Sequence, residues 1–121
     1  MAYLGISAMR SDAALAESLS RARQATLSLP AVQGDTVCCG MFGRAAFFDL
    51  LARRRGDAEA GAMRGRIVTD FLQRGPHQAG LVEGASEFIN LTGFFNGLSG
   101  IGYELVRMYL DSTLQPVMLW E

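Results

Sequence analysis

Apolar residues recur every three to four positions over most of the chain, and this spacing predicts amphipathic helices rather than strands. We expect helices near residues 1–9, 12–28, 41–55, 57–74 and 98–110, and no sheet of consequence. The predicted fold class is therefore all-α. Between residues 77 and 96 no period persists, and Gly80, Gly84 and Gly93 favour a long connecting loop there.

The residues between the predicted helices are ones that end or cap a helix. Leu29-Pro30 should end the helix over 12–28, because a proline disfavours helical geometry in the residue before it. Gly56 should stop the next helix, and Gly75-Pro76 the one after it. Side-chain oxygens can accept the free N–H groups of a first helical turn, so Asp57 and Asn96 are predicted to cap the helices that follow them.

The apolar stripes also predict which side chains the helices bury. The helix over 12–28 should leave Glu17, Arg21 and Arg23 facing water. The run Arg53-Arg54-Arg55 lies at a helix C-terminus, where cations complement the helix dipole. The apolar tail, residues 116–121, should pack back onto the body with Trp120 in the core. Side chains predicted to lie inside are Leu15, Leu19, Ala22, Leu27, Phe47, Phe48, Leu50, Leu51, Ala62, Met63, Ile67, Phe71 and Leu72.

Half of the 121 residues are apolar, which suffices for a core and for one domain at most. The eleven cations, all arginine, are scattered among twelve carboxylates. Because they form no basic patch, we expect no nucleic-acid partner. No apolar run approaches the length of a membrane span, and residues 1–10 lack the basic start and cleavage site of a signal peptide. We therefore expect no membrane partner and a cytoplasmic location.

The two cysteines, Cys38 and Cys39, are adjacent and lie directly in front of a predicted helix. Neighbouring cysteines seldom form a disulfide with each other, and cytoplasmic thiols are kept reduced. The pair is therefore either two small buried hydrophobes or two metal ligands. His77, the only histidine, is either a solvated loop residue or a further ligand. Asp35 either bonds to backbone amides of the cysteine turn or is an ordinary turn residue.

An internal repeat links two of the predicted helices. Gly40-Met41-Phe42-Gly43 opens one helix, and its counterpart Gly97-Leu98-Ser99-Gly100 opens another. In each case the glycines allow a tight turn and a close approach to neighbouring backbone. Helix pairs that repeat with this period are typical of an α/α solenoid or a closed toroid. Residues 1–6 are similar to the helix that follows such a motif, so we expect the chain to be truncated at its N-terminus, within a repeat.

Three stretches, in this order, carry a resemblance to a known family: Asp35-Thr36-Val37-Cys38-Cys39-Gly40, then residues 93–103, then residues 114–121. Over its whole length the chain resembles the C-terminal part of the cyclase domain of class II lanthipeptide synthetases (LanM) and the related LanC cyclases. The resemblance implies that residues 1–121 are a C-terminal fragment of a LanC-like cyclase domain. Such a domain is an α/α toroid, the LanC-like six-hairpin barrel.

The resemblance also implies the chemistry of the complete protein. It implies a central zinc ion with Cys38 and Cys39 as two ligands, as in the subgroup that has Cys-Cys-Gly at this position. The third zinc cysteine and the catalytic acid or base would precede Met1, so the catalytic residues are unknown and activity of the fragment is left open. The implied reaction belongs to lantibiotic biosynthesis: a precursor-peptide cysteine adds to dehydroalanine or dehydrobutyrine and forms a (methyl)lanthionine thioether ring.

Two other interpretations stay open. The chain could be a non-catalytic helical interaction module or remnant, since an incomplete toroid exposes apolar surface and favours self-association. It could also belong to another α/α toroid, although the acidic pairs and aromatic platforms of prenyltransferase-like or carbohydrate-active enzymes are not evident. For the cyclase interpretation we expect both cysteine sulfurs at the concave inner end of the toroid. Their pKa values should be lowered by the helix N-terminus.

Overall fold

The computed structural model describes residues 13–32, 34–79, 93–110 and 113–116. Within these ranges the chain is helical and has no strand, which confirms the all-α prediction. The elements are α2 (Ala13–Ser28), α3 (Met41–Arg55), α4 (Ala58–Arg74), the short 3₁₀ helix η1 (Pro76–Gln78) and α5 (Leu98–Tyr109). The bounds of the four α-helices agree with the predicted ones to within one residue. The predicted helix at 1–9, most of the predicted loop and the tail with Trp120 lie outside the described residues.

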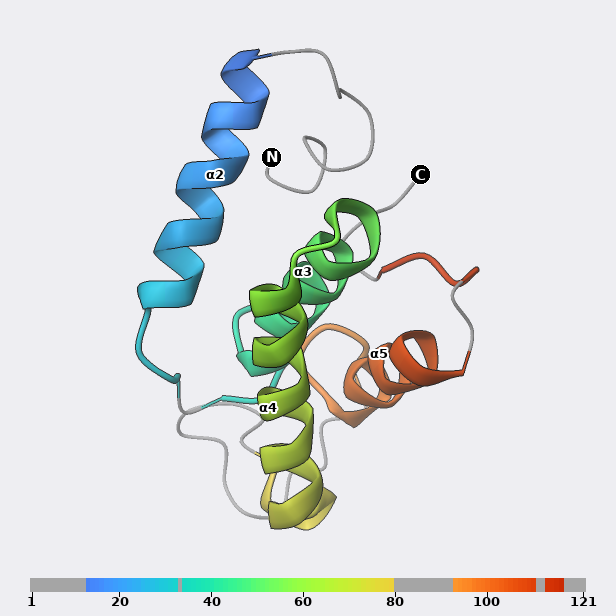
Figure 1. Ribbon diagram of the computed structural model, residues 1–121. Helices are drawn as coiled ribbons and strands as arrows, with labels where there is room; N and C mark the ends of the chain where they lie inside the picture. The colour runs from blue at the N-terminus through green and yellow to red at the C-terminus, as the bar shows by residue number, and fades with distance from the viewer. Residues whose placement is uncertain (1–12, 33, 80–92, 111–112, 117–121) are drawn as a thin grey trace.

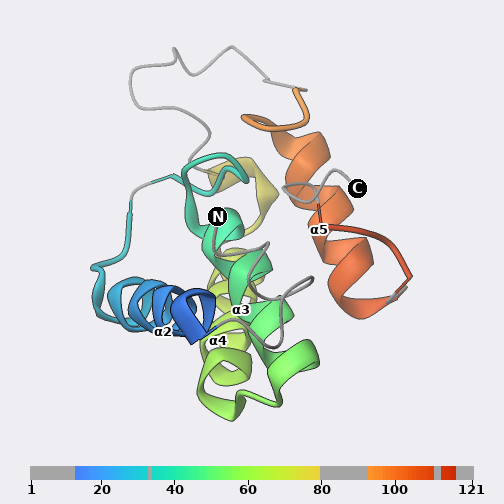
Figure 2. The same ribbon diagram turned by 90° about the horizontal axis from the view of Figure 1, so that it is seen from above.

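Helix α3 lies at the centre of the described structure, as Figures 1 and 2 show. Its chain turns back through Gly56 and Asp57 into α4, and the two helices pack along each other as an antiparallel hairpin. Helix α5 packs against a second side of α3. Because α3 is covered by its neighbours, it buries eight of its residues, all apolar except Asp49. None of the described helices is long and apolar enough to cross a lipid bilayer.

The hairpin between α3 and α4 forms where the sequence predicts it. Gly56 has φ +68°, in the left-handed region that favours glycine, and its N–H donates to the carbonyl of Ala52 at 3.0 Å. The carboxylate of Asp57 then accepts the N–H of Ala60 at 3.0 Å, which caps α4. Gly75, with φ +82°, ends α4. Both predicted glycine stops and the predicted Asp57 cap are therefore confirmed.

The predicted Asn96 cap is wrong. Helix α5 begins after Gly97, whose backbone is extended and which makes no side-chain cap hydrogen bond. Helix α3 begins in the same way after Gly40. In both cases the first helical turn lies against the backbone of the preceding loop, so the helix start is fixed by a close approach rather than by a capping side chain.

The buried face of α4 is rotated from the predicted one. Ala60, Ile67, Val68 and Phe71 are buried, whereas Leu72 is 60% exposed, which contradicts its predicted place in the core. The ring of Phe71 meets that of Phe42 edge to face, with centroids 4.9 Å apart. This contact fixes the rotation of α4 on α3. It turns the next residue, Leu72, about 100° away, toward solvent.

Helix α2 contributes one buried side chain, Leu19, and an ionic contact that the sequence did not predict. Arg23, expected to face water, donates to the carboxylates of Asp57 and Glu59 at the start of α4. The hydrogen bond from Arg23 lowers the pKa of Asp57 below its usual range. Arg23 faces α4 because its guanidinium is attracted to two carboxylates there, the capping residue Asp57 and Glu59 in the first turn.

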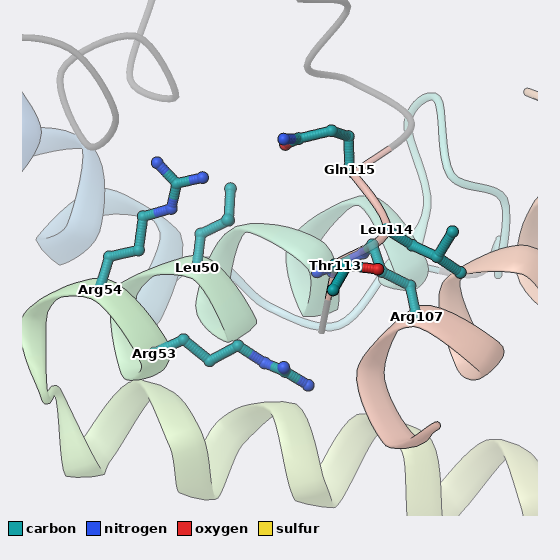
Figure 3. Close-up of a pocket in the computed structure, with 7 residues that line it drawn as sticks. All are labelled: Leu50, Arg53, Arg54, Arg107, Thr113, Leu114 and Gln115. Atoms are coloured by element: carbon teal, nitrogen blue, oxygen red, sulfur yellow. The ribbon is translucent and has the colours of Figure 1, made fainter. Parts of the chain in front are cut away.

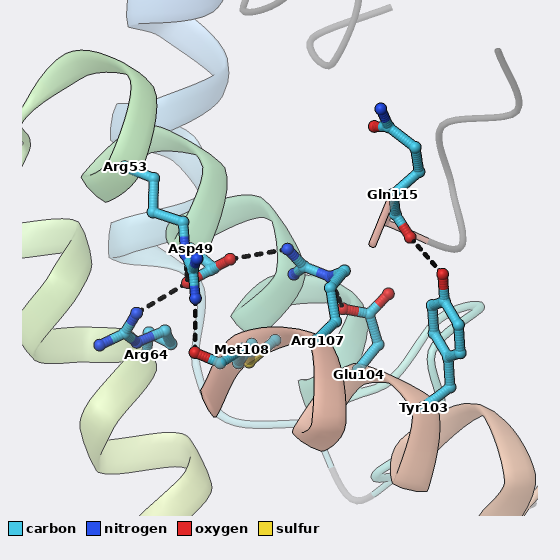
Figure 4. Close-up of polar contacts among 8 residues, drawn as sticks. All are labelled: Asp49, Arg53, Arg64, Tyr103, Glu104, Arg107, Met108 and Gln115. Carbon is cyan, nitrogen blue, oxygen red and sulfur yellow. Dashed lines mark hydrogen bonds and ion pairs between the residues drawn. The ribbon is translucent and has the colours of Figure 1, made fainter. Parts of the chain in front are cut away.

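A buried ionic cluster, formed by Asp49, Arg53, Arg64, Glu104 and Arg107, joins three helices (Figure 4). Asp49 of α3 is fully buried, and its carboxylate accepts from Arg53 at 2.9 Å and from Arg64 and Arg107 at 2.7 Å. Burial by itself raises the pKa of Asp49, but the three arginines outweigh it and hold the pKa below its ordinary value. Asp49 therefore stays ionised and ties α4 and α5 to α3.

The cluster also changes the interpretation of the arginine run at the end of α3. Arg53 donates to Asp49 and to the carbonyl of Met108 in α5. It therefore joins two helices, whereas the sequence predicted only a general complement to the dipole of its own helix.

Candidate functional site

Cys38 and Cys39 lie in a tight turn that leads directly into α3, and both are exposed. Their exposure contradicts the interpretation as two buried hydrophobes. The turn closes through a hydrogen bond of 3.0 Å from the N–H of Gly40 to the carbonyl of Thr36. A Cβ on Gly40 would lie 2.3 Å from the nitrogen of Thr36, so only glycine fits. The packed turn leaves the cysteine side chains outside it, at the N-terminal end of α3.

The two Gly-x-x-G stretches of the sequence have the same local structure. A Cβ on Gly43, in the first turn of α3, would lie 2.4 Å from the carbonyl oxygen of Val37. A Cβ on Gly100, in the first turn of α5, would lie 1.7 Å from the carbonyl oxygen of Phe94. In each repeat a loop carbonyl lies against the glycine that is the third residue of the helix. The sequence repeat is therefore a repeat of structure.

This repeat places Cys38-Cys39 and Phe95-Asn96 at equivalent positions in front of their helices. The two loops also contact each other, because the N–H of Cys38 donates to the carbonyl of Phe95 at 3.1 Å. Phe95 is 41% exposed, so an aromatic side chain is accessible next to the thiols. The loop in front of α5 thus supports the cysteine turn from one side.

An ion pair anchors the cysteine turn from another side. Asp35 is almost fully buried, and both of its oxygens accept from Arg74 at the end of α4, at 2.9 and 3.1 Å. The hydrogen bond to Asp35, and a second to Asp70, raise the pKa of Arg74. Neither alternative predicted for Asp35 included this partner. The pair holds the segment before Cys38 against α4, which limits the positions that the thiols can take.

The ionisation of Cys38 depends on its neighbour Cys39. The pKa of Cys38 is raised, first by a hydrogen bond to Cys39, then by the charge of Cys39, and last by burial. The predicted lowering of the Cys38 pKa is therefore wrong, because a thiolate on one cysteine favours the proton on its neighbour more than the helix N-terminus disfavours it. A metal ion bound by the pair would displace the thiol protons, because metals bind the thiolate form of cysteine.

A complete metal site is not present among the described residues, because no three His, Cys, Asp or Glu side chains there converge on a common point. His77 lies in η1 and is exposed, with a ring nitrogen 3.5 Å from the side-chain amide of Gln78. It does not join the cysteines in such a group. Zinc needs three protein ligands at a catalytic site, so the pair Cys38 and Cys39 fits as two of them and leaves one or more to be supplied.

The sequence did not point to Asp49, Glu104 and Arg107 as important residues. A signal was present, since Asp49 interrupts the otherwise apolar run Ala45–Leu51 and would face the core at helical spacing. A charged residue on such a face needs buried partners. Arg107 of α5 is such a partner, and it pairs in turn with Glu104, three residues before it.

These features define a class: an all-helical protein in which equivalent glycine loops start two of the helices, α3 and α5, and one loop presents a thiol pair. The chain matches the family described as "Lanthionine synthetase C-like protein" over residues 1–119, and it belongs to this family. The family is known as an α/α toroid, its members often bind zinc, and membership implies a role related to lanthionine cyclisation. Neither a search of curated proteins nor one of solved structures found a match.

Proposed function

We propose that the chain provides two zinc ligands, Cys38 and Cys39, to the active site of a lanthionine cyclase. The observation that carries the proposal is the pair of adjacent, exposed thiols at the start of α3 in a LanC-like chain. Buried cysteines act as inert small hydrophobes, whereas exposed thiols can exchange their protons for a metal ion. Thiolate is a preferred ligand of zinc, so the donor atoms agree with the metal.

The remaining ligand or ligands would come from outside the described residues. We propose that in the complete domain α3 and α5 are neighbouring helices of an α/α toroid, with the cysteine turn at its inner end. The bond from Cys38 to the carbonyl of Phe95 supports this arrangement, because it brings two equivalent loops together at one end of the helices.

The substrate we propose is a precursor peptide that carries cysteine together with dehydroalanine or dehydrobutyrine. Zinc at this site would lower the pKa of the substrate thiol, so that the substrate sulfur would be a thiolate near neutral pH. The substrate sulfur adds to the β-carbon of the dehydro residue, the C=C bond opens, and the α-carbon takes up one proton. The product is a thioether, and the addition needs no oxidant or reductant.

The role of the chain's own residues in this reaction is to place the two ligand sulfurs. Gly40 and Gly43 allow the turn to close on the first turn of α3. The ion pair of Asp35 with Arg74 and the carbonyl of Phe95 then hold the turn from two sides. Because these supports are already in place, the sulfurs need little rearrangement when metal binds.

Metal titration tests the ligand assignment. Zinc affinity is measured by competition with a chromophoric chelator, and cobalt is used in parallel because its thiolate bonds give a charge-transfer absorption. Cys38→Ser and Cys39→Ser should each weaken zinc binding at least about tenfold and reduce the cobalt–thiolate band. Even the loss of a residue that only hydrogen-bonds to a metal ligand weakens metal binding by about this factor. His77→Gln is the matched control and should leave both readouts unchanged. A serine variant that binds zinc as tightly as the parent chain would disprove the assignment.

Ring formation in the complete synthetase tests the activity. Cyclisation leaves the peptide mass unchanged but consumes free thiols, so alkylation followed by mass spectrometry counts the rings. Cys38→Ser or Cys39→Ser should leave the thiols of the dehydrated peptide free for alkylation.

A second candidate function is a non-catalytic helical interaction module. The exposed apolar side chains of Val106, Tyr109 and Leu110, on and after α5, favour it. Failure of the complete, zinc-loaded protein to form rings would support this second candidate.

A further inference from the structure

A pocket with a volume of about 370 Å³ lies between the C-terminal half of α3, the helix α5 and the segment Thr113–Gln115 (Figure 3). The hydroxyl of Tyr103 donates to the carbonyl of Gln115 at 2.7 Å and so holds this segment beside α5 (Figure 4). The pocket is about 20 Å from the cysteine turn, since most of the length of α3 separates them. It is therefore a separate site, and nothing in the proposed cyclase chemistry uses it.

Three arginines line this pocket: Arg53, Arg54 and Arg107. Arg107 is only 3% exposed. Its Nε donates to Glu104 and its Nη1 to Asp49, but its Nη2 is buried and has no hydrogen-bond partner among the described residues. The Nε of Arg64, in the same ionic cluster, is also buried without a described partner, so the cluster holds more buried donors than acceptors.

The charge around the pocket is not balanced among the described residues. The buried ionic cluster holds three arginines against the two carboxylates of Asp49 and Glu104. Arg54 adds a fourth guanidinium at the pocket wall, and it forms no ion pair with a carboxylate of the described residues. The excess of positive charge beside a partly enclosed space favours an anion.

The rest of the lining indicates which kind of anion would fit. Leu50 and Leu114 give the pocket an apolar part, while Thr113 and Gln115 add neutral polar groups. A phosphate ion could bind the arginines but would make no apolar contact with the leucines. A carboxylate on a short carbon chain can bind the arginines with its charged end and pack its carbon chain against the leucines. We propose that this pocket binds a small aliphatic carboxylate, either a free acid or the carboxylate end of a peptide.

The test uses the 121-residue chain and a matched pair of probes, butyrate and butyramide, which differ in charge but hardly in shape. Binding is followed at constant ionic strength by two-dimensional NMR, with the arginine Nε–H signals as local reporters. Butyrate should shift the signals of Arg53 and Arg107 and bind at least about tenfold more tightly than butyramide, because bonds to a charged acceptor are lost with the amide. Inorganic phosphate should bind more weakly than butyrate.

Two variants locate the site. Arg54→Gln should weaken butyrate binding roughly fivefold to tenfold, because it removes a guanidinium from the wall without touching the Asp49 bonds. Arg66→Gln, an equal charge change on the exposed face of α4, is the control and should leave the affinity unchanged. Circular dichroism checks that both variants are folded. If Arg54→Gln does not fold, the comparison of butyrate with butyramide and phosphate on the parent chain still tests the proposal.

The outcomes separate clearly. The proposal is overturned if butyrate and butyramide bind equally well, or if phosphate binds more tightly than butyrate. It is also overturned if Arg54→Gln and Arg66→Gln reduce the affinity for butyrate equally. A short peptide, N-acetyl-Gly-Leu with a free carboxylate, distinguishes the two sources: tighter binding than butyrate supports a peptide end, and weaker binding supports a free acid. None of these results depends on zinc or on the cysteines, so the proposal and the cyclase assignment can fail independently.

Discussion

Asp49 should be the single most important polar residue for the stability of the described structure, and Asp49→Asn tests this. The carboxylate is fully buried and accepts hydrogen bonds from three arginines on α3, α4 and α5. Asparagine keeps the size of the side chain but removes the negative charge and replaces one acceptor oxygen with an N–H donor. At least one arginine would then face a donor, and the buried cations would lose their counter-charge.

Removing one partner of a buried ion pair typically costs about 3–5 kcal/mol, because the other charge is left uncompensated. We expect a loss in this range for Asp49→Asn. Since the arginines at the cluster are partly exposed except for Arg107, most of the loss should come from the Arg107 contact. Native domains are stable by roughly 5–15 kcal/mol in total, so the variant should lose about a fifth of its stability or more.

Equilibrium unfolding in urea, followed by circular dichroism, measures the free energy of unfolding, and a thermal scan should show Tm lower by about 10–20 °C. The matched control is Asp70→Asn, which makes the same chemical change at an ion pair on the surface of α4. Asp70 is 67% exposed, so its loss should cost less than about 1 kcal/mol. Equal effects of the two variants would refute the inference that the cluster holds the helices together.

The pH dependence provides an independent check. The pKa of Asp49 in the folded protein lies below its ordinary value of 3.8. A depressed carboxyl pKa contributes stability that is present above the unfolded pKa and is lost as the pH falls through the folded pKa. The stability difference between the parent chain and Asp49→Asn should therefore narrow below about pH 4. A difference that stays constant into this acidic range would show that the charge of Asp49 is not the cause.

Three further predictions concern the loops and the surface. Gly100→Ala should cost roughly 2 kcal/mol in urea unfolding, because its Cβ would overlap the carbonyl of Phe94, whereas Gly102→Ala, with open space around it, should be neutral or stabilising by up to about 1 kcal/mol. Cys39→Ser should lower the pKa of Cys38, since Cys39 is the main cause of its rise, and should speed alkylation by iodoacetamide at pH 8; an unchanged rate would contradict the coupling. Sedimentation velocity should show concentration-dependent self-association that Leu110→Glu weakens, because Leu110 is 80% exposed; the exposed control Leu72→Glu should have no such effect.

The sequence alone was sufficient to predict the helices and most of their ends. Helical hydrogen bonds join residues four apart, and the caps at Gly56, Asp57 and Gly75 act within a single turn, so the information is local. The glycine repeat could also be recognised from the sequence. A close approach of two backbone segments excludes every residue with a Cβ, so glycine recurs at each such position. The same local signals carried the resemblance to the LanC-like family, which the match over residues 1–119 confirms at the level of the family.

Only the tertiary structure decided how the helices face one another and which charges meet. Asp49 and Arg107 are 58 residues apart, and Asp35 and Arg74 are 39 apart, so no local pattern could pair them. The rotation of α4 that exposes Leu72 depends on how Phe71 meets a ring on another helix. The raised pKa of Cys38 depends on the relative position of two side chains, which adjacency in sequence does not fix. Burial, pairing and ionisation are properties of the packed molecule, because each depends on neighbours that only folding brings together.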